Sequence, residues 1–330
     1  MKAAMITGID RIELTTIPDP TPRPRDVVIQ VVATGICGTD LHILEGEFAP
    51  SLPVVPGHEF AGRVVEIGAD VTEVAVGDAV AVDPSLYCFE CYYCQRGQAN
   101  LCERWNAIGI TEPGGAAEFA RAPVGNCFKL PDGLDVATAA LVEPLACAVR
   151  GFDVLPLKLG TNYLIYGAGT MGLMMMELAK RAGAIDVSVV DLNPARLETA
   201  RLLGCTAAVT SSAEVERARG WDVVIDCTGV PAAIEDGLRQ VGRGGTFLQF
   251  GVSGEHALAS FEPFKVYNRE ITITGSMAIL NSFERARDLF VAGAIRPDVM
   301  ISESFALDEY ADAVKQFRAG VGRKLIITPN

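Results

Sequence analysis

Four cysteines lie close together in one segment of the chain and could bind a metal ion. They follow the pattern C-x2-C-x2-C-x7-C and are Cys88, Cys91, Cys94 and Cys102. Four thiolates at this spacing can surround one Zn(II) tetrahedrally, which leaves no coordination position for a substrate. The alternative is a loop of four thiols without metal, which would leave reactive cysteines exposed. The pattern therefore favours a structural zinc site.

A second group of possible metal ligands is dispersed over three short segments. It comprises a thiol, an imidazole and two carboxylates, which are Cys37, His58, Glu59 and Glu143. Spacing alone could not assemble them, because a lone Cys or His is usually a core or surface residue and a single Glu is usually solvated. The chain has three histidines, however, and two of them, His42 and His58, lie in these segments. The group is therefore a candidate for a catalytic metal site.

A glycine-rich turn predicts a dinucleotide site. Gly167, Gly169 and Gly172 fit the pattern G-x-G-x-x-G, with Thr170 and Met171 between the last two glycines. The turn follows an apolar strand-like run and opens a helical segment, which an ordinary Gly-rich turn need not do. In such a turn the glycines let the backbone approach the pyrophosphate, and the free amides of the helix N-terminus face the phosphate groups.

The cofactor preference can be read from the next predicted strand. Asp191 ends that strand, nineteen positions after Gly172. Its carboxylate can accept hydrogen bonds from both hydroxyls of the adenosine ribose and would repel a 2'-phosphate, so NAD is favoured over NADP. Arg196 could weaken this preference, although it could equally be a solvated helix residue. Thr228 and Gly251 are further candidates for cofactor contacts.

The elements that must position these residues change in character along the chain. Up to about residue 131, short β-rich runs alternate with Gly and Pro, as at 26–33, 59–67 and 78–82, and predict a compact all-β domain. Residues 136–152 predict a helix that leads to a second domain. A β-α-β unit follows, with a strand at 163–166, a helix at 173–182 and a strand at 187–190.

Later strands complete the predicted second domain. They are separated by helical stretches, as a parallel, doubly wound α/β sheet requires. We place them at 223–227, 246–250 and 271–274. Beyond residue 281 we expect a helix at 282–292, a strand near 300–304, a helix at 307–320 and a strand at 324–328.

Length, composition and charge narrow the class of protein. With 330 residues, 49% hydrophobic and 21% charged, the chain is long enough for two well-folded domains. A net charge of -13 disfavours nucleic acid and anionic membrane surfaces as partners. The start of the sequence predicts no signal peptide and no apolar run predicts a membrane span, so we expect a cytoplasmic protein. Its nine cysteines then suggest metal binding or packing rather than disulfides.

Taken together, these motifs resemble the zinc-containing medium-chain alcohol dehydrogenases over essentially the whole chain. The resemblance rests on the four-cysteine segment and on Gly57-His58-Glu59 with Gly62 and Gly68, Cys37-Gly38-Thr39-Asp40-x-His42, and Glu143-Pro144. Within this family the chain resembles the polyol branch, which includes sorbitol and threonine dehydrogenases, because position 143 is a Glu rather than a Cys.

The resemblance implies a fold, a metal content and an assembly. It implies a GroES-like catalytic domain formed by 1–150 and 282–330, and a Rossmann NAD-binding domain at 151–281. It also implies two zinc ions per chain, with the catalytic one near Cys37, His58, Glu59 and Glu143. Asp40 would orient His58 by accepting its remaining ring proton. A homo-oligomer, dimer or tetramer, built through the nucleotide domains is expected.

Thr39 and His42 have expected catalytic roles because their spacing from Cys37 matches the family. Thr39 would receive the proton of the alcohol and pass it through the cofactor ribose to His42, because histidine is the residue type best suited to proton exchange at physiological pH. Without the resemblance, Thr39 would be an ordinary capping residue and His42 a surface histidine. Glu143 would act in catalysis as well as at the metal.

One segment departs from the family pattern. Sorbitol dehydrogenases carry an Arg-Tyr pair that holds the polyol in the segment aligned with Met277 to Leu280, and here Ala278-Ile279 take those positions. We therefore expect oxidation of a secondary alcohol, such as a polyol, sugar alcohol or cyclitol, to a ketone by NAD. Alternatives are an NADPH-preferring ketone reductase of the same fold and a catalytically silent zinc and nucleotide-binding protein.

Overall fold

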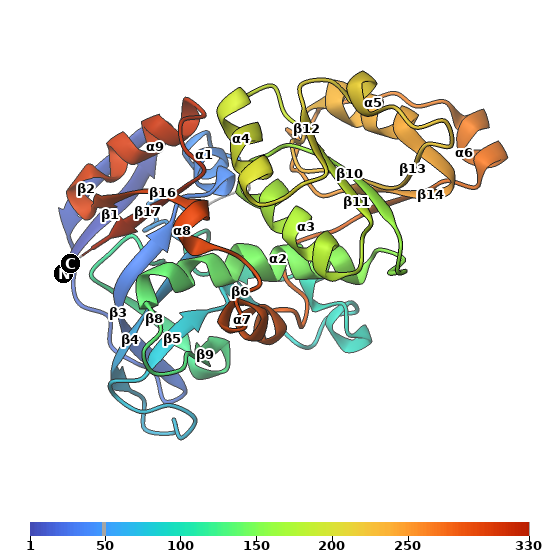
Figure 1. The fold of residues 1–330 in the computed structure, drawn as a ribbon. Coiled ribbons are helices and arrows are strands. Elements are labelled where there is room, and N and C mark those ends of the chain that lie inside the picture. Colours follow the sequence, from blue (N-terminus) through green and yellow to red (C-terminus); the bar gives the residue numbers. More distant parts are fainter. Residues whose placement is uncertain (48–50, 330) are drawn as a thin grey trace. The chain divides into compact units, whose positions relative to one another are not determined.

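The computed structural model describes residues 1–47 and 51–329 (Figure 1). The chain forms two compact units, and the first of them is assembled from both ends of the sequence. It comprises Met1–Ala146 and Ile279–Asn330, and the second unit comprises Cys147–Ala278. These bounds lie a few residues from the boundaries expected at 150/151 and 281/282. Within the described ranges, no helix is both long and apolar enough to cross a membrane.

The first unit is built on a seven-stranded sheet. Its order is β16-β17-β3-β4-β5-β9, and β8 also pairs with β3. The central pair, β3 and β4, is antiparallel and carries two register shifts, which is consistent with β-bulges. The strands are β3 (Asp26–Gly35), β4 (Glu59–Ile67), β5 (Ala79–Val82), β8 (Phe119–Pro123), β9 (Cys127–Lys129), β16 (Ile301–Ala306) and β17 (Lys324–Thr328).

Two small antiparallel sheets complete the strands of this unit. They pair β1 (Lys2–Gly8) with β2 (Arg11–Thr16), and β6 (Ser85–Leu86) with β7 (Asn106–Ala107). The α-helices of the unit are α1 (Gly38–Leu44), α7 (Phe283–Val291), α8 (Pro297–Met300) and α9 (Tyr310–Arg318).

The C-terminal strand joins the sheet of the N-terminal segment. β17 lies parallel to β16 and antiparallel to β3, with Ile326 opposite Gly35. One hydrophobic core also contains residues from both segments, among them Ile43 of α1, Val314 of α9 and Leu325 of β17. Burial of this apolar surface therefore ties the last residues of the chain to the first.

The second unit is a doubly wound parallel sheet. Its strand order β12-β11-β10-β13-β14-β15 corresponds to 3-2-1-4-5-6, the order of dinucleotide-binding folds. The order reverses between β10 and β13, so the carboxyl ends of these strands flank the expected ligand position. The strands are β10 (Asn162–Tyr166), β11 (Asp186–Val190), β12 (Ala207–Val209), β13 (Trp221–Asp226), β14 (Val241–Gln249) and β15 (Thr272–Gly275).

The helices of the second unit alternate with its strands, as a doubly wound sheet requires. They are α3 (Thr170–Arg181), α4 (Pro194–Leu202), α5 (Pro231–Gln240) and α6 (Pro263–Arg269). Several details differ from the sequence prediction. The segment up to about residue 131, expected to be all-β, also contains the helix α1. The helix expected at 136–152 starts as a 3-10 segment, Val136–Leu141, before α2 (Val142–Asp153). β12 was not predicted, because three residues of sequence Ala-Ala-Val give almost no periodic signal.

Candidate active site and metal centres

The dispersed thiol, imidazole and carboxylate come together in the first unit. One ligand atom each from Cys37, His58 and Glu59 lies within 4.8 Å of the others. The pairing of β3 with β4 explains this, because Gly35 at the end of β3 is opposite Glu59 at the start of β4. Cys37 follows β3 as the N-cap of α1. A Cβ at position 35 would lie 2.0 Å from Glu59 Oε2, so this close approach requires glycine.

Glu143, the fourth expected ligand, lies outside that cluster but is electrostatically coupled to it. It is in the first turn of α2 and is 7% exposed. Burial raises the pKa of the Glu143 carboxyl to about 8, while His58 lowers it and the charges of Glu59 and Cys37 raise it further. The structure therefore brings three of the predicted ligands together. The fourth, Glu143, lies near enough for the charges of the other three to shift the pKa of its carboxyl.

Asp40 is arranged partly as expected. Its Oδ2 accepts a hydrogen bond from the amide of Cys37 at 2.8 Å. Its Oδ1 lies 3.8 Å from Nδ1 of His58, which is ion-pair distance rather than a hydrogen bond. Asp40 thus holds the turn that carries Cys37 and faces the ring nitrogen of His58.

Lys324 is a residue of this site that the sequence analysis missed. Its ammonium group donates hydrogen bonds to Glu59 Oε1 at 2.8 Å, to Glu59 Oε2 at 2.6 Å and to the carbonyl of Ile36 at 2.9 Å. Burial alone would lower the pKa of Lys324, but the charge and hydrogen bonds of Glu59 outweigh it and raise that pKa. In the sequence, Lys324 could have been noticed as a lysine at the start of an otherwise apolar strand. No sequence pattern indicates that Glu59 is its partner.

The donor set of this cluster fits zinc. Burial, and then the charge of Glu59, raise the pKa of the Cys37 thiol to about 12. A buried thiol of this kind becomes a thiolate when a cation binds it. One sulfur, one imidazole nitrogen and carboxylate oxygens are the atoms that Zn(II) binds in catalytic sites.

The four cysteines of the second metal site also converge, within 4.8 Å of one another. Cys88 Sγ lies 3.9 Å from Cys94 Sγ, and Cys91 Sγ lies 3.9 Å from Cys102 Sγ. A tetrahedron with Zn–S bonds of about 2.3 Å has edges of about 3.8 Å, so these separations match. Backbone amides, first that of Glu90, lower the pKa of Cys88 to about 6, whereas burial raises the pKa of Cys94 to about 12.

The glycine-rich turn lies between β10 and α3 and is shaped as a dinucleotide site requires. Gly167 has φ 96°, which side chains other than glycine rarely adopt. A Cβ at Gly172 would lie 1.7 Å from the carbonyl oxygen of Gly167, so the helix can pack this closely only without a side chain. Nothing lies within 4 Å of a Cβ built at Gly169, which leaves its backbone open to a ligand. Thr170 and Met171 begin α3, whose N-cap lacks a side-chain hydrogen bond, so its amides can face phosphate.

Asp191 directly follows β11 and is held beside the glycine-rich turn. Its Oδ2 accepts a hydrogen bond from the amide of Ala168, and its Oδ1 accepts one from the amide of Asn193, each at 2.7 Å. Arg196 Nη1 is 4.0 Å from Asp191 Oδ2. The carboxylate expected to bind the ribose therefore has a fixed orientation, and a cation stands next to it.

Thr228 and Gly251 both bond to a buried aspartate that was not predicted. Asp226, at the end of β13, is fully buried, and its Oδ1 accepts a hydrogen bond from Thr228 Oγ1 at 2.6 Å. The amide of Gly251 donates to the carbonyl oxygen of Asp226 at 2.7 Å. In the sequence, Asp226 could have been noticed as an aspartate that ends an apolar strand. Asp226 thus fixes the loops after β13 and β14, where we expected cofactor contacts.

Thr39 and His42 both lie on α1, close to the thiol. Thr39 Oγ1 is 3.7 Å from Cys37 Sγ. His42 Nδ1 lies 2.6 Å from Glu47 Oε2, and the His42 side chain is 23% exposed. The carboxylate partner of His42 was not predicted. The positions are compatible with the expected proton relay, whose middle step through the cofactor ribose stays a prediction.

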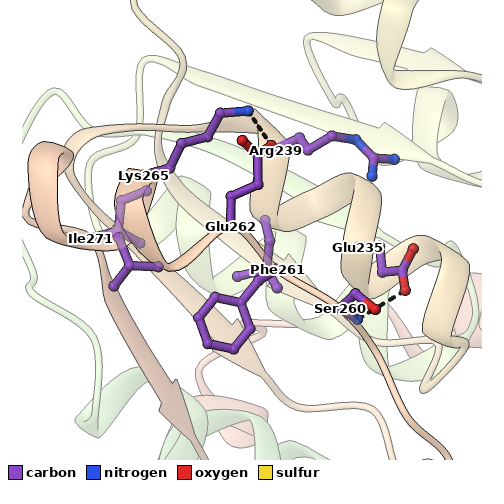
Figure 2. A pocket seen from close by; sticks show the side chains of 9 residues that line it. Glu235, Arg239, Ser260, Phe261, Glu262, Lys265 and Ile271 are labelled. Carbon is purple, nitrogen blue, oxygen red and sulfur yellow. Dashed lines mark hydrogen bonds and ion pairs between the residues drawn. The ribbon is translucent and has the colours of Figure 1, made fainter.

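A surface hollow of the second unit is separate from these sites. Figure 2 shows it between α5 and the segment that leads into α6, with Lys265 paired to Glu262 and the amide of Ser260 bonded to Glu235. Its volume is about 200 Å³. None of the predicted site residues lines it, so we do not assign it to cofactor or substrate.

Comparison with known proteins identifies the family. Residues 23–132 match the model of the alcohol dehydrogenase GroES-like domain, and residues 170–292 match that of the zinc-binding dehydrogenases. D-arabinitol dehydrogenase 1 of Uromyces fabae is 36% identical over 316 residues, which cover 92% of this chain and 90% of that protein. The chain belongs to the zinc-dependent medium-chain alcohol and polyol dehydrogenases. The predicted family, fold class and enzyme class are thereby confirmed.

Solved structures agree with this dehydrogenase over its whole length. A protein described as a zinc-binding dehydrogenase of Sinorhizobium meliloti 1021, bound to NADP, is 36% identical, with a TM-score of 0.96 over 99% of both chains. An alcohol dehydrogenase of E. coli CFT073, complexed with NADH, is 28% identical, with a TM-score of 0.90 over 99% of both chains. The dehydrogenase thus uses zinc and a nicotinamide cofactor, and its relatives differ in which cofactor they hold.

Proposed function

We propose that this dehydrogenase oxidises a secondary alcohol of a polyol, sugar alcohol or cyclitol to the ketone, with NAD as the hydride acceptor. The observation that carries the proposal is the convergence of Cys37, His58 and Glu59 within 4.8 Å, with Glu143 buried and coupled to them. The glutamate at position 143 and the similarity to an arabinitol dehydrogenase support the polyol class. In this proposal the first unit carries catalysis and the second holds NAD.

The residues of the chain have distinct tasks in this reaction. Cys37, His58, Glu59 and Glu143 would hold Zn(II), which as a Lewis acid favours loss of the hydroxyl proton of the substrate. Thr39, beside Cys37, would accept that proton while its own hydroxyl proton moves on toward His42, which with its partner Glu47 would deliver a proton to solvent. Lys324 shares the carboxylate of Glu59, so Glu59 can approach or leave the metal without becoming an unpaired buried charge.

The segment aligned with the polyol-gripping pair supports a substrate other than sorbitol. Ile279 is 1% exposed, and its carbonyl oxygen accepts a hydrogen bond from the hydroxyl of Tyr87 at 2.6 Å. Neither Ile279 nor Ala278 has a polar side chain for a hydroxyl of the substrate. A smaller or less polar secondary alcohol, or a polyol held by other residues, fits this segment.

We propose that the nucleotide-binding unit associates with a second copy of the chain. β15 is the end strand of its sheet, and Ile273 on it is 43% exposed. The preceding residues add exposed apolar side chains, namely Leu258, Phe261, Phe264 and Tyr267. An unpaired strand edge with apolar neighbours is a natural place for association. We expect a homo-oligomer, dimer or tetramer, that Ile273→Lys converts to monomers in light scattering.

The runner-up is a ketone reductase that prefers NADPH. It is supported by the NADP-bound relative and by the proximity of Arg196 to Asp191. Cofactor preference measured on the purified enzyme separates the two. For either activity we propose a cytoplasmic location, because none of the nine cysteines forms a disulfide. Five of them lie in the two metal clusters, and burial raises the thiol pKa of Cys127, Cys205 and Cys227.

The experiment is a zinc assay combined with a substrate screen. The enzyme should contain two zinc ions per chain and oxidise one or more polyols, cyclitols or simple secondary alcohols with NAD. Cys37→Ala and His58→Ala should each lose one zinc and nearly all turnover. Near-normal turnover in either variant, with full zinc content, would refute the catalytic assignment.

A further inference from the structure

Three buried polar atoms near Cys37, His58 and Glu59, which we call the catalytic cluster, have no hydrogen-bond partner among residues 1–47 and 51–329. They are the hydroxyl of Tyr310, Oδ1 of Asp40 and Nδ1 of His58. Their residues are 2%, 1% and 5% exposed. A buried polar atom without a hydrogen bond destabilises the folded state, so three such atoms in one region require an explanation.

Two of the three atoms face each other, and the third belongs to a helix that packs against the helix carrying Asp40. Asp40 Oδ1 is 3.8 Å from His58 Nδ1. Tyr310 begins α9, which packs against α1, the helix that carries Asp40 (Figure 1). After burial, the charges of Asp40 and Cys37 raise the pKa of Tyr310 further above its ordinary value, so its hydroxyl lies within their electrostatic reach.

One arrangement satisfies all three atoms. In it, the Tyr310 hydroxyl would donate to Asp40 Oδ1, which would also accept the Nδ1 proton of His58, while Oδ2 keeps the hydrogen bond from the amide of Cys37. A carboxylate oxygen has two acceptor positions, so Oδ1 can serve both donors. With its proton on Nδ1, His58 presents Nε2 to the metal.

We propose that Tyr310 is a positioning residue for the metal ligand His58 and acts through Asp40. The proposal rests on the zinc site of the proposed function. The ring of Tyr310 fills the core beside Ile36 and Ile43, and its hydroxyl supplies the polar contact. The C-terminal segment therefore reaches the catalytic cluster at two points, at Glu59 through Lys324 and at Asp40 through Tyr310.

Zinc release from the holoenzyme tests this proposal without relying on activity. Tyr310→Phe keeps the ring in the core and removes only the hydroxyl. Because partners of metal ligands typically change metal affinity 10- to 100-fold, zinc should leave the catalytic site roughly 10- to 100-fold faster in a chelating indicator. Zinc at the four cysteines should leave at the unaltered rate. With Co(II) in the catalytic site, the visible absorption bands should also shift.

Two further variants make the result specific. Tyr163→Phe removes another buried tyrosine hydroxyl, in the second unit, and should leave both release rates unchanged. In an Asp40→Asn background, Tyr310→Phe should add no further effect, because Tyr310 acts through Asp40.

The outcomes separate this proposal from the proposed function. Equal release rates in Tyr310→Phe and the unaltered enzyme would overturn the positioning role alone, and so would faster release from both zinc sites together. If the unaltered enzyme binds zinc only at the four cysteines, both the proposed function and this inference fail.

Discussion

Lys324 donates hydrogen bonds to both carboxylate oxygens of Glu59, at 2.8 and 2.6 Å, although 265 positions separate the two residues. Their side chains are 4% and 1% exposed. A buried pair of this kind gives little net stability when compared with apolar residues, but the loss of either partner leaves a buried charge without compensation. The pair therefore makes the catalytic cluster sensitive to a residue at the far end of the chain.

We predict that Lys324→Met destabilises the protein by about 3–5 kcal/mol, because it removes the charge and keeps most of the side-chain volume. Urea unfolding of the metal-free protein measures the effect. Adding Glu59→Gln should recover much of the loss, because the unpaired carboxylate is then gone. As a control, Lys315→Met breaks an exposed pair with Asp312 on α9 and should change stability by less than about 1 kcal/mol. Equal stability of the Lys324 and Lys315 variants would contradict the prediction.

Cys94→Ser should remove the structural zinc and leave the catalytic one. The variant should contain one zinc ion per chain instead of two, and it should unfold at a lower temperature because closed zinc sites contribute directly to folding. Elemental analysis and thermal unfolding check this. Cys205→Ser, which alters a cysteine outside both clusters, should change neither quantity. A full complement of zinc in Cys94→Ser would show that the four cysteines do not act together.

Asp191→Ala should weaken the preference for NAD over NADP. A hydrogen bond to a charged group is worth about 1.5–3 kcal/mol, so the ratio of kcat/KM values for the two cofactors should fall roughly 10- to 100-fold. Arg196→Ala should move the ratio in the opposite direction, because it removes the cation that could accept a 2'-phosphate. An unaltered enzyme that already prefers NADP would defeat this prediction and favour the reductase.

His42→Ala should slow alcohol oxidation mainly at low pH. We expect a loss of roughly 10- to 100-fold, at the low end of general acid-base effects, because solvent can partly replace the histidine. Added imidazole buffer should restore part of the rate. The exposed third histidine gives a matched control, and His256→Ala should behave like the unaltered enzyme. If the His42 variant did not respond to buffer, His42 would have no place in the relay.

The pH dependence of stability should contain a contribution from Asp83, at the end of β5. Burial raises the pKa of this carboxyl from 3.8 to about 6, although the amide of Ser85 opposes the shift. Between these values the unfolded chain has lost the proton that the folded protein keeps, so stability falls as the pH rises from about 4 to 6 and then levels off.

Asp83→Asn should remove this fall and stabilise the protein at pH 7 by roughly 2–3 kcal/mol. The amide keeps an acceptor for the backbone of Ser85, which now bonds to Asp83 Oδ1 at 2.9 Å. Unfolding midpoints of both proteins at pH 4 and pH 7 give the comparison. Parallel pH profiles would show that Asp83 titrates normally.

The sequence predicted the residues of the site better than it predicted their neighbours. Cys37, His58 and Glu59 could be named because their segments match a family motif, and Asp191 because it follows a strand at a known spacing. Lys324 could not be paired with Glu59, because their contact depends on the pairing of β17 with β3, which no local pattern encodes.

Tyr310 could not be assigned for the same reason. Its proposed contact with Asp40 depends on the packing of α9 against α1, which no local pattern encodes. The expected cofactor contacts of the second unit were more predictable, because Gly167, Asp191 and Thr228 each lie just after a strand of its sheet. Contacts between residues distant in sequence are thus what the prediction lacked.

The position of β17 between β16 and β3 has a consequence for biosynthesis. At about 5–20 residues per second, a ribosome makes Lys324 roughly 10 to 50 seconds after Glu59. The nucleotide-binding unit is complete before then, whereas Cys37, His58 and Glu59 still belong to a sheet that lacks β17. A nascent chain that stops short of Lys324 should therefore be able to fold around its dinucleotide turn but not to finish a catalytic centre.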